Sequence, residues 1–484
     1  MRILISAIIA VMALSLPAWA GDVVGWRTDG TGKYPQATPP TVWAKDKNVA
    51  WATKLPAFSN ATPVVAGDRI FTCVEPATLV CVSAKDGSIL WQKGNDYADV
   101  MGDDYAKKVE QAVKFRGPVD RGNYKLAVIQ QQIAQNDDAA KKATTRAASQ
   151  PAAQKHVDEL MARRADLNAQ LETAKKALAA AEAQYKPFAA FSRPDVHPVN
   201  GYSSQTPVTD GRYVCVVFGT GIAACYDMQG NRQWAKLLEQ GPGGWGISTS
   251  PTMHDGKFIV QVKKLFCLDA KTGKEIWSAA PSFHWGSIVK TKIGDTDVIV
   301  MPGGEIIRVA DGKIICTLQP MEYCAPVVDQ GVVYCSSDHA FAAFALPKKS
   351  ADKLEIKPLW TTQVMGARHY ASPVVADGLA YNLNDGGVLE VMDVKDGKLA
   401  YSEKLGFKGG TCYPSLALAG KYLYASSDNG VTIVFEPGRK YKEVARNTLE
   451  TFRSCPVFIG GRMYVRAEKN LYCIEITANF TRND

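Results

Sequence analysis

Residues 268–277 read LDAKTGKEIW, and this phrase decides the fold. It predicts a short apolar strand, a tight turn that contains glycine, and a second strand around Trp277. Weaker copies recur at Ser83–Trp91, Tyr226–Trp234 and Met392–Tyr401. A phrase that returns along a chain at intervals of some tens of residues predicts a repeat architecture rather than several unrelated domains.

Each repeat is expected to hold four strands, because apolar runs and turn residues alternate regularly along it. The first strand follows a proline, and the fourth carries a Trp or another apolar residue. The prolines are Pro63, Pro207, Pro251, Pro326, Pro373, Pro414 and Pro456, and Ser287–Val289 is an eighth first strand without one. The fourth strands are expected around Trp51, Trp91, Trp234, Trp277, Cys316, Trp360, Tyr401 and Val444. Four-stranded units that need neighbours to bury their faces are typical of propeller blades.

The two ends of the chain supply complementary parts of one repeat. The last repeat stops after Leu471–Ile474 without a fourth strand, whereas Val49–Ala52 is a strand with no strands before it. Pairing these segments would complete a blade and remove an open sheet edge. The sequence therefore predicts an all-β protein, an eight-bladed β-propeller whose N-terminal strand closes the last blade.

The phrase that ends at Trp277 and its copies resemble the tryptophan-docking repeat of the pyrroloquinoline-quinone (PQQ) type propellers. The resemblance covers residues 45–93 and 200–476. It implies the propeller fold but leaves the function open, because the family includes quinoprotein dehydrogenases as well as non-catalytic assembly factors of the outer membrane.

The dehydrogenases of this family are expected to hold PQQ with calcium in the upper funnel, against a disulfide between adjacent cysteines and beside a carboxylate base. The chain contains no Cys-Cys dipeptide, and no position matches the calcium-binding Glu and Asn of that pattern. It is therefore more similar to the assembly factors, and we expect no cofactor and no catalytic residue. Non-catalytic binding or scaffolding is the predicted function, and a PQQ-dependent oxidoreductase with the cofactor in the central funnel is the alternative.

Residues 94–200 separate two repeats and are rich in Ala, Lys, Gln and Glu. Small or apolar residues recur here at a spacing of three and four, which is typical of helices. Ser149-Gln150-Pro151 falls between two such runs, so residues 120–186 are expected to form a helical, coiled-coil-like hairpin. The hairpin either engages a partner or a second copy of the chain, or pairs only with itself. The recurring residues are Leu126, Ile129, Ile133, Ala140, Ala143 and Ala147, then Val157, Leu160, Leu167, Leu171, Ala174, Leu178 and Ala181.

The first residues have the composition of a secretory signal. Met1-Arg2 precedes an apolar run from Ile3 to Leu16, and small residues stand at Ala18 and Ala20. A signal peptide cleaved after Ala20 is predicted, with a buried strand or a membrane anchor as the alternative. Because Gly21 rather than cysteine follows the cleavage point, a lipoprotein is not expected. The protein is therefore predicted to be exported, either to the periplasm or outside the cell.

Four regions follow from these observations. Residues 1–20 are the signal peptide, residues 21–93 hold the closing strand and the first blade, residues 94–200 are the helical insertion, and residues 201–484 are blades two to eight. No stretch after the signal is long and apolar enough to predict a transmembrane segment. The formal net charge is +8, but the basic residues are scattered, so nucleic acid is not a predicted partner.

The eleven cysteines have two readings. Export favours disulfides, and Cys73 with Cys81, or Cys215 with Cys225, could face each other across a hairpin. Alternatively, the cysteines are small buried hydrophobic residues between the blades.

The residues just before each first strand are expected to line the upper mouth of a central channel. Aromatic and cationic side chains gather at these positions, and such a concavity suits an envelope protein, a peptide or a saccharide. The alternative is a plug that fills the channel. No metal site is predicted, because the six histidines are dispersed along the chain. The candidate ligand-binding residues are Tyr202, Trp245, His284, Trp285, Tyr323, Arg368, His369, Tyr370 and Arg453.

Overall fold

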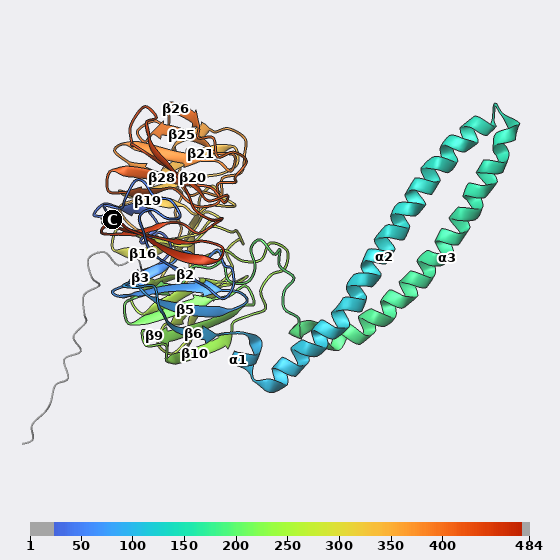
Figure 1. Cartoon of the computed structure of the whole chain (residues 1–484), viewed down its shortest axis with the longest axis horizontal. Coiled ribbons are helices and arrows are strands. Elements are labelled where there is room, and N and C mark those ends of the chain that lie inside the picture. Colours follow the sequence, from blue (N-terminus) through green and yellow to red (C-terminus); the bar gives the residue numbers. More distant parts are fainter. Residues whose placement is uncertain (1–23, 477–484) are drawn as a thin grey trace, which may run out of the picture. The chain divides into compact units, whose positions relative to one another are not determined.

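The computed structural model describes residues 24–476, so the predicted signal at residues 1–20 lies outside the described residues. The described chain forms two compact units. Residues 97–193 make the smaller unit, which is helical, and the residues on either side of them make the larger unit, which is built from strands (Figure 1). The chain is therefore mostly β with one helical insertion, as the sequence predicts.

Within residues 24–476 the strands of the larger unit form eight sheets of four antiparallel strands, one of which gains a parallel fifth strand. In six of these sheets the strands lie side by side in chain order, which is the pattern expected for short strands joined by tight turns; the other two also take a strand from the N-terminal side of the chain. The first four sheets are β3 (Val64–Ala66), β4 (Arg69–Val74), β5 (Thr78–Ser83) and β6 (Ile89–Gly94); β7 (Val208–Thr209), β8 (Tyr213–Val217), β9 (Ile222–Asp227) and β10 (Arg232–Leu237); β11 (Thr252–His254), β12 (Lys257–Gln261), β13 (Leu265–Asp269) and β14 (Glu275–Ala279); and β15 (Val289–Ile293), β16 (Thr296–Val300), β17 (Glu305–Arg308) and β18 (Ile314–Thr317).

The next three sheets follow the same plan, and the last one is completed from the N-terminal side of the chain. The predicted fourth strands all lie in fourth strands of the structure. These sheets are β19 (Val327–Asp329), β20 (Val332–Ser336), β21 (Ala340–Ala345) and β22 (Pro358–Gln363); β23 (Val374–Ala376), β24 (Leu379–Leu383), β25 (Val388–Asp393) and β26 (Leu399–Lys404); β27 (Ala417–Ala419), β28 (Tyr422–Ser426), β29 (Val431–Phe435) and β30 (Glu443–Thr448); and β31 (Val457–Ile459), β32 (Arg462–Arg466) and β33 (Asn470–Ile474) with β2 (Val49–Lys54).

The strand near the N-terminal end completes the last sheet, as predicted. In the antiparallel register of β2 and β33, Trp51 stands opposite Cys473 and Lys54 opposite Asn470. The expectation that no strand precedes Val49 is wrong, because β1 (Lys33–Tyr34) pairs in parallel with β27. A two-residue strand shows no alternation of apolar and polar residues, so no sequence pattern marks it.

Tryptophans within fourth strands join neighbouring sheets. Trp277 on β14 donates a hydrogen bond from Nε1 to the carbonyl oxygen of Val309 in the next sheet, at 2.9 Å. The turn glycine of that sheet, Gly312, has φ +74°, and a Cβ atom added there would lie 2.6 Å from the indole. The repeated phrase therefore pairs the glycine of one repeat with the tryptophan of the preceding one. Trp234 with Gly273, and Trp360 with Gly397, repeat this arrangement.

The smaller unit is a helical hairpin. It holds α1 (Tyr97–Met101), α2 (Asp103–Ala147), the short 3₁₀ turn η1 (Pro151–Ala153), α3 (Gln154–Tyr185) and η2 (Lys186–Phe191). Figure 1 shows α2 and α3 running antiparallel along each other. Ala140 and Ala143 of α2 pack against Val157 and Leu160 of α3, as the three-four spacing predicts.

The first helix of the hairpin begins earlier than predicted. It starts at Asp103 rather than near residue 120, and Pro118 lies inside it. The buried face extends to Val109 and Ala112, so side-chain burial continues the helix past the hydrogen bond that proline removes. No helix among residues 24–476 is long and apolar enough to cross a membrane.

Removing the hairpin is expected to leave the sheets folded. The variant replaces α2 and α3 (Asp103–Tyr185) by a Gly-Ser linker, and we expect the midpoint of thermal unfolding, followed by the β-sheet circular dichroism signal, to stay within about 3 °C of the full chain. The reason is that the hairpin carries its own apolar seam. A broad transition or a loss of cooperativity in the shortened chain would show that the sheets depend on it.

Register decides between the two predicted cysteine pairs. Cys215 and Cys225 stand directly opposite each other on β8 and β9, as expected. Cys73 does not face Cys81, because Cys73 pairs with Leu79, and Phe71 pairs with Cys81. That expectation was wrong because spacing across a hairpin does not fix the register of the strands. All eleven cysteines are buried and free of disulfides in the described part of the chain.

Candidate functional site

Side chains that lie just before the first strands line a cavity of about 280 Å³ in the larger unit. Several sheets contribute to it, because each sheet begins with a short strand preceded by a loop. The cavity contains rings, hydroxyl groups and two guanidinium groups, while its described lining holds no aspartate or glutamate. Several of its lining residues belong to the set that the sequence predicts for an upper mouth.

Hydrogen bonds connect each sheet to the next beside the cavity, at the start of the first strands. At most junctions a backbone amide near the start of a first strand donates to a hydroxyl or thiol group in the following sheet. This bond is absent between Ser287 and Ala325, because the alanine side chain offers no acceptor. The last bond returns to the first sheet. The donor–acceptor pairs are Thr62 to Thr206, Thr206 to Ser250, Ser250 to Ser287, Ala325 to Ser372, Ser372 to Ser415, Ser415 to Cys455 and Cys455 to Thr62, at 2.9–3.4 Å.

Four aromatic side chains from consecutive sheets form one continuous wall of the cavity. The rings of Trp285 and Tyr323 are stacked, with centroids 5.7 Å apart. Tyr323 meets Tyr370 edge to face at 5.4 Å, and Tyr370 stacks on Tyr413 at 4.7 Å. Burial raises the pKa of Tyr323 and that of Tyr413, so both phenols are neutral at ordinary pH. The wall therefore offers apolar ring surface edged with hydroxyl groups.

Two arginines lie against this wall. The Arg368 guanidinium carbon is 5.8 Å from the centre of the Tyr323 ring, and that of Arg453 is 5.5 Å from the Tyr413 ring. Arg368 also donates to the Tyr370 hydroxyl at 3.1 Å, while Arg453 lies 3.4 Å from the Asp428 carboxylate. Stacking holds both cations in place at the cavity, where they would attract carboxylate or phosphate groups.

A segment near the N-terminal end of the described chain also reaches the cavity. Trp26 contributes to the lining, and the neighbouring Arg27 is completely buried. The Arg27 Nη2 group donates to the carbonyl oxygens of Pro373 at 2.9 Å and Leu416 at 2.8 Å. These bonds join the segment to two sheets.

Six of the nine predicted residues line the cavity together: Trp245, Trp285, Tyr323, Arg368, Tyr370 and Arg453. Trp245 is half exposed and stacks on the His197 ring at 4.1 Å.

The other three predicted residues lie outside the lining. The Tyr202 hydroxyl donates to the carbonyl oxygen of Pro194, and its amide donates to Glu75. His284 accepts a hydrogen bond from Thr249 through its backbone carbonyl oxygen. His369 is completely buried, and burial lowers its pKa to about 4.

Sequence reasoning missed several residues of the lining. Tyr413 lies four residues before the first strand β27, as Tyr323 lies before β19 and Tyr370 before β23, so the pattern could have found it. Thr206 and Ser250, which contribute hydroxyl groups, each directly precede a proline. Trp26 has no such signal, because it belongs to a segment outside the repeats.

The comparison with protein families decides the relationship. The family described as outer membrane protein assembly factor BamB matches residues 37–152, 200–279 and 222–479, which together make up most of the chain. The chain belongs to this family. The resemblance to PQQ-type repeat propellers is thereby confirmed. No curated protein matches the chain.

Solved structures resemble both branches that the repeat implies. BamB from Moraxella catarrhalis is 10% identical with a TM-score of 0.54, and the match covers 88% of this chain and 99% of that one. The quinohemoprotein alcohol dehydrogenase of Comamonas testosteroni is 11% identical with the same TM-score, over 95% of this chain and 81% of that one. The enzyme ADHIIG of Pseudomonas putida HK5 is also 11% identical, with a TM-score of 0.54 over 96% and 82%. At such identities these likenesses show the fold alone.

Proposed function

We propose that this member of the BamB family is an exported, non-catalytic binding propeller whose upper mouth holds an acidic, aromatic peptide segment of an envelope protein. The observation that carries the proposal is the stacked wall from Trp285 to Tyr413 with the guanidinium groups of Arg368 and Arg453 laid against it. The aromatic wall can stack with an aromatic side chain of a peptide, and the two guanidinium groups can form charge-assisted hydrogen bonds with its carboxylates.

The proposal treats the eight sheets as blades of one closed ring. It is supported by the hydrogen bond from Cys455 back to Thr62 and by the pairing of β2 with β33. A site whose side chains come from several blades is preorganised, because each loop is fixed by its own sheet. The exposed side chains of Val113, Tyr124 and Met161 make the helical hairpin a second contact surface in this proposal.

The alternative is an oxidoreductase that uses PQQ with calcium. Calcium in proteins takes oxygen ligands and favours carboxylates, and the reaction needs a base. The described lining of the cavity contains no aspartate or glutamate, so it offers neither a carboxylate ligand nor a carboxylate base. The residues present therefore do not fit a calcium-bound quinone, and we derive no reaction through it.

The test uses two short peptides that share one aromatic residue and differ only in carrying glutamate or glutamine. We expect the full chain to bind the glutamate peptide about tenfold more tightly, because a carboxylate pairs with a guanidinium group. Replacing Arg453 by glutamine should remove most of this preference in a fluorescence titration. Arg439→Gln is the matched control, since Arg439 is exposed and pairs with Asp393.

The aromatic wall gives a separate prediction. Replacing Trp245 and Trp285 together by alanine should weaken the glutamate peptide by about tenfold or more, because each ring contact contributes roughly 0.5–1.5 kcal/mol. If the double variant lowers the unfolding temperature but leaves the dissociation constant unchanged, the rings are a plug. Binding of a neutral oligosaccharide instead of the peptides would point to a saccharide site, and oxidation of an alcohol after addition of PQQ and calcium would favour the enzyme.

A further inference from the structure

A second cavity, of about 240 Å³, lies in the larger unit beside a cluster of one histidine and two aspartates. His254 ends β11, Asp255 follows it in the turn to β12, and Asp297 belongs to β16 of the next sheet. The His254 Nε2 atom lies 3.2 Å from an Asp297 carboxylate oxygen and 3.4 Å from one of Asp255. One ligand atom from each residue lies within 4.8 Å of the others.

The local fold brings these groups together. Asp255 and Gly256 have φ of +45° and +70°, which makes the two-residue turn of the β11–β12 hairpin left-handed. Asp and Gly tolerate this conformation, and it sets the Asp255 carboxylate back against His254. Asp297 stands opposite Lys292 on β15, whose amine contacts the Oδ1 atom at 3.2 Å. Its other oxygen, Oδ2, is the one that faces His254.

The Nε2 atom of His254 lies within ion-pair distance of two carboxylate oxygens. It is buried, and neither contact has the geometry of a hydrogen bond among the described residues. In tetrahedral zinc coordination, with bonds of about 2.0–2.2 Å, neighbouring ligand atoms are about 3.4 Å apart. The two nitrogen–oxygen distances agree with this spacing.

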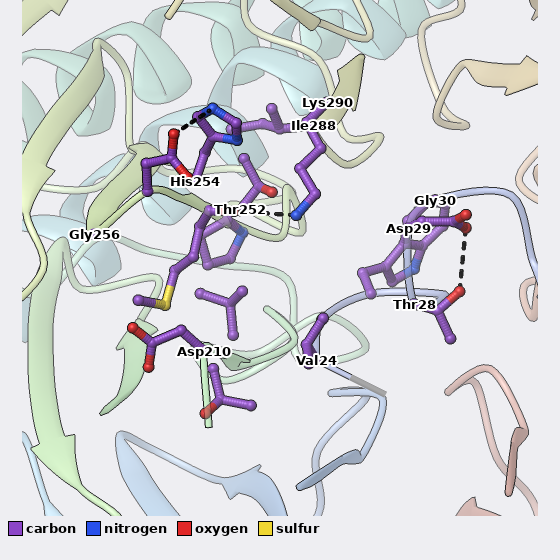
Figure 2. A pocket seen from close by; sticks show the side chains of 17 residues that line it. Val24, Thr28, Asp29, Gly30, Asp210, Thr252, His254, Gly256, Ile288 and Lys290 are labelled. Carbon is purple, nitrogen blue, oxygen red and sulfur yellow. Dashed lines mark hydrogen bonds and ion pairs between the residues drawn. The ribbon is translucent and has the colours of Figure 1, made fainter. Parts of the chain in front are cut away.

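The ligand types decide which cation fits. An imidazole with two carboxylates suits zinc and similar divalent ions, whereas calcium and magnesium prefer oxygen alone. Three protein ligands leave one coordination position for water, and the adjacent cavity gives that water room. In Figure 2, His254 and Lys290 lie on one side of the cavity, and Thr28 and Asp29 of the N-terminal segment lie on the other.

We propose that His254, Asp255 and Asp297 form a binding site for a divalent zinc-type cation whose remaining position opens to this cavity. The site is separate from the upper mouth, since none of its three ligands lines that cavity. The proposal of a cation site is independent of the peptide-binding function proposed above.

The experiment is a calorimetric titration of the tag-free full chain with zinc chloride alone, after treatment with a chelator. We expect one equivalent to bind, and His254→Gln and Asp297→Asn to weaken the binding by roughly tenfold or more. His197→Gln is the matched control, because His197 is exposed and stacks on Trp245. With cobalt in place of zinc, the visible absorption of the bound ion should be lost in His254→Gln and in Asp297→Asn and kept in His197→Gln.

A further variant keeps the test independent of folding. Lys292→Gln removes a positive charge beside Asp297, so it should tighten zinc binding several-fold. A purely structural ion pair between protonated His254 and the aspartates would give no stoichiometric binding in the wild-type chain. That result, or zinc binding that survives unchanged in His254→Gln, overturns the proposal.

Discussion

Replacing Trp277 by alanine is expected to lower the free energy of unfolding by about 3–5 kcal/mol, as for other large buried aromatic side chains. The indole belongs to the same buried apolar cluster as Ile299 and Ile307 of the next sheet, and its Nε1–H donates to the carbonyl oxygen of Val309. Truncation therefore leaves a cavity and an unpaired carbonyl oxygen at the junction of two sheets. Urea unfolding followed by circular dichroism measures the loss.

The partner of this tryptophan offers a finer test. Gly312→Ala should destabilise the chain by the cost of a left-handed alanine, about 1–2 kcal/mol, and by a further 1–3 kcal/mol or so for displacing the indole. Gly378 has the same φ, +74°, but a Cβ atom added there meets no atom within 4 Å. Gly378→Ala should therefore show the first cost alone. Equal losses in the two variants would mean that glycine is required only for the turn.

A second large effect is expected from pH. Burial lowers the pKa of His369 to about 4, whereas an unfolded histidine titrates near 6.5. Between about pH 4 and about pH 6.5, therefore, this histidine binds a proton in the unfolded chain but not in the folded chain. Stability from this group should be complete above about pH 6.5 and should fall by about 3 kcal/mol as the pH decreases to about 4.

The measurement compares urea unfolding at pH 7 and pH 4.5 for the wild type and for His369→Leu, which fills a similar volume without titrating. The variant should lose most of the histidine contribution to the pH dependence. His156→Gln is the control, because His156 is exposed on α3. A variant that keeps the full dependence would assign it to other groups.

The repeat architecture could be predicted because each strand appears in the sequence as a run of several adjacent apolar residues bounded by turn residues. The Trp and Gly of the repeated phrase lie ten or fewer positions apart, yet they contact each other only between neighbouring repeats, as Trp277 and Gly312 do. What the sequence could not supply was register. Cys73 and Cys81 lie eight positions apart and Cys215 and Cys225 ten, but only the second pair stands face to face.

The candidate site was predictable to the extent that it repeats. Trp285, Tyr323 and Tyr370 precede first strands, and their positions follow from counting strands. Tyr202 also precedes a first strand, but it lies outside the cavity lining, where its amide bonds to Glu75 and its hydroxyl group to Pro194. Such contacts between distant parts of the chain are not visible in the local sequence. The His254 cluster was beyond prediction, because Asp297 joins it across two sheets and no metal-ligand spacing marks it in the sequence.

The pairing of β2 with β33 sets the order in which the molecule can be completed. Trp51 is made early in synthesis, and its partner Cys473 follows more than four hundred residues later. The last sheet therefore stays open until nearly the whole chain exists, and contacts of such high sequence separation slow folding. Until β2 and β33 pair, β33 has an unpaired edge, which β2 of a second copy can occupy instead of the β2 of the same chain. Swapped dimers should consequently accumulate when the protein is refolded at high concentration, and fewer should form when it is diluted.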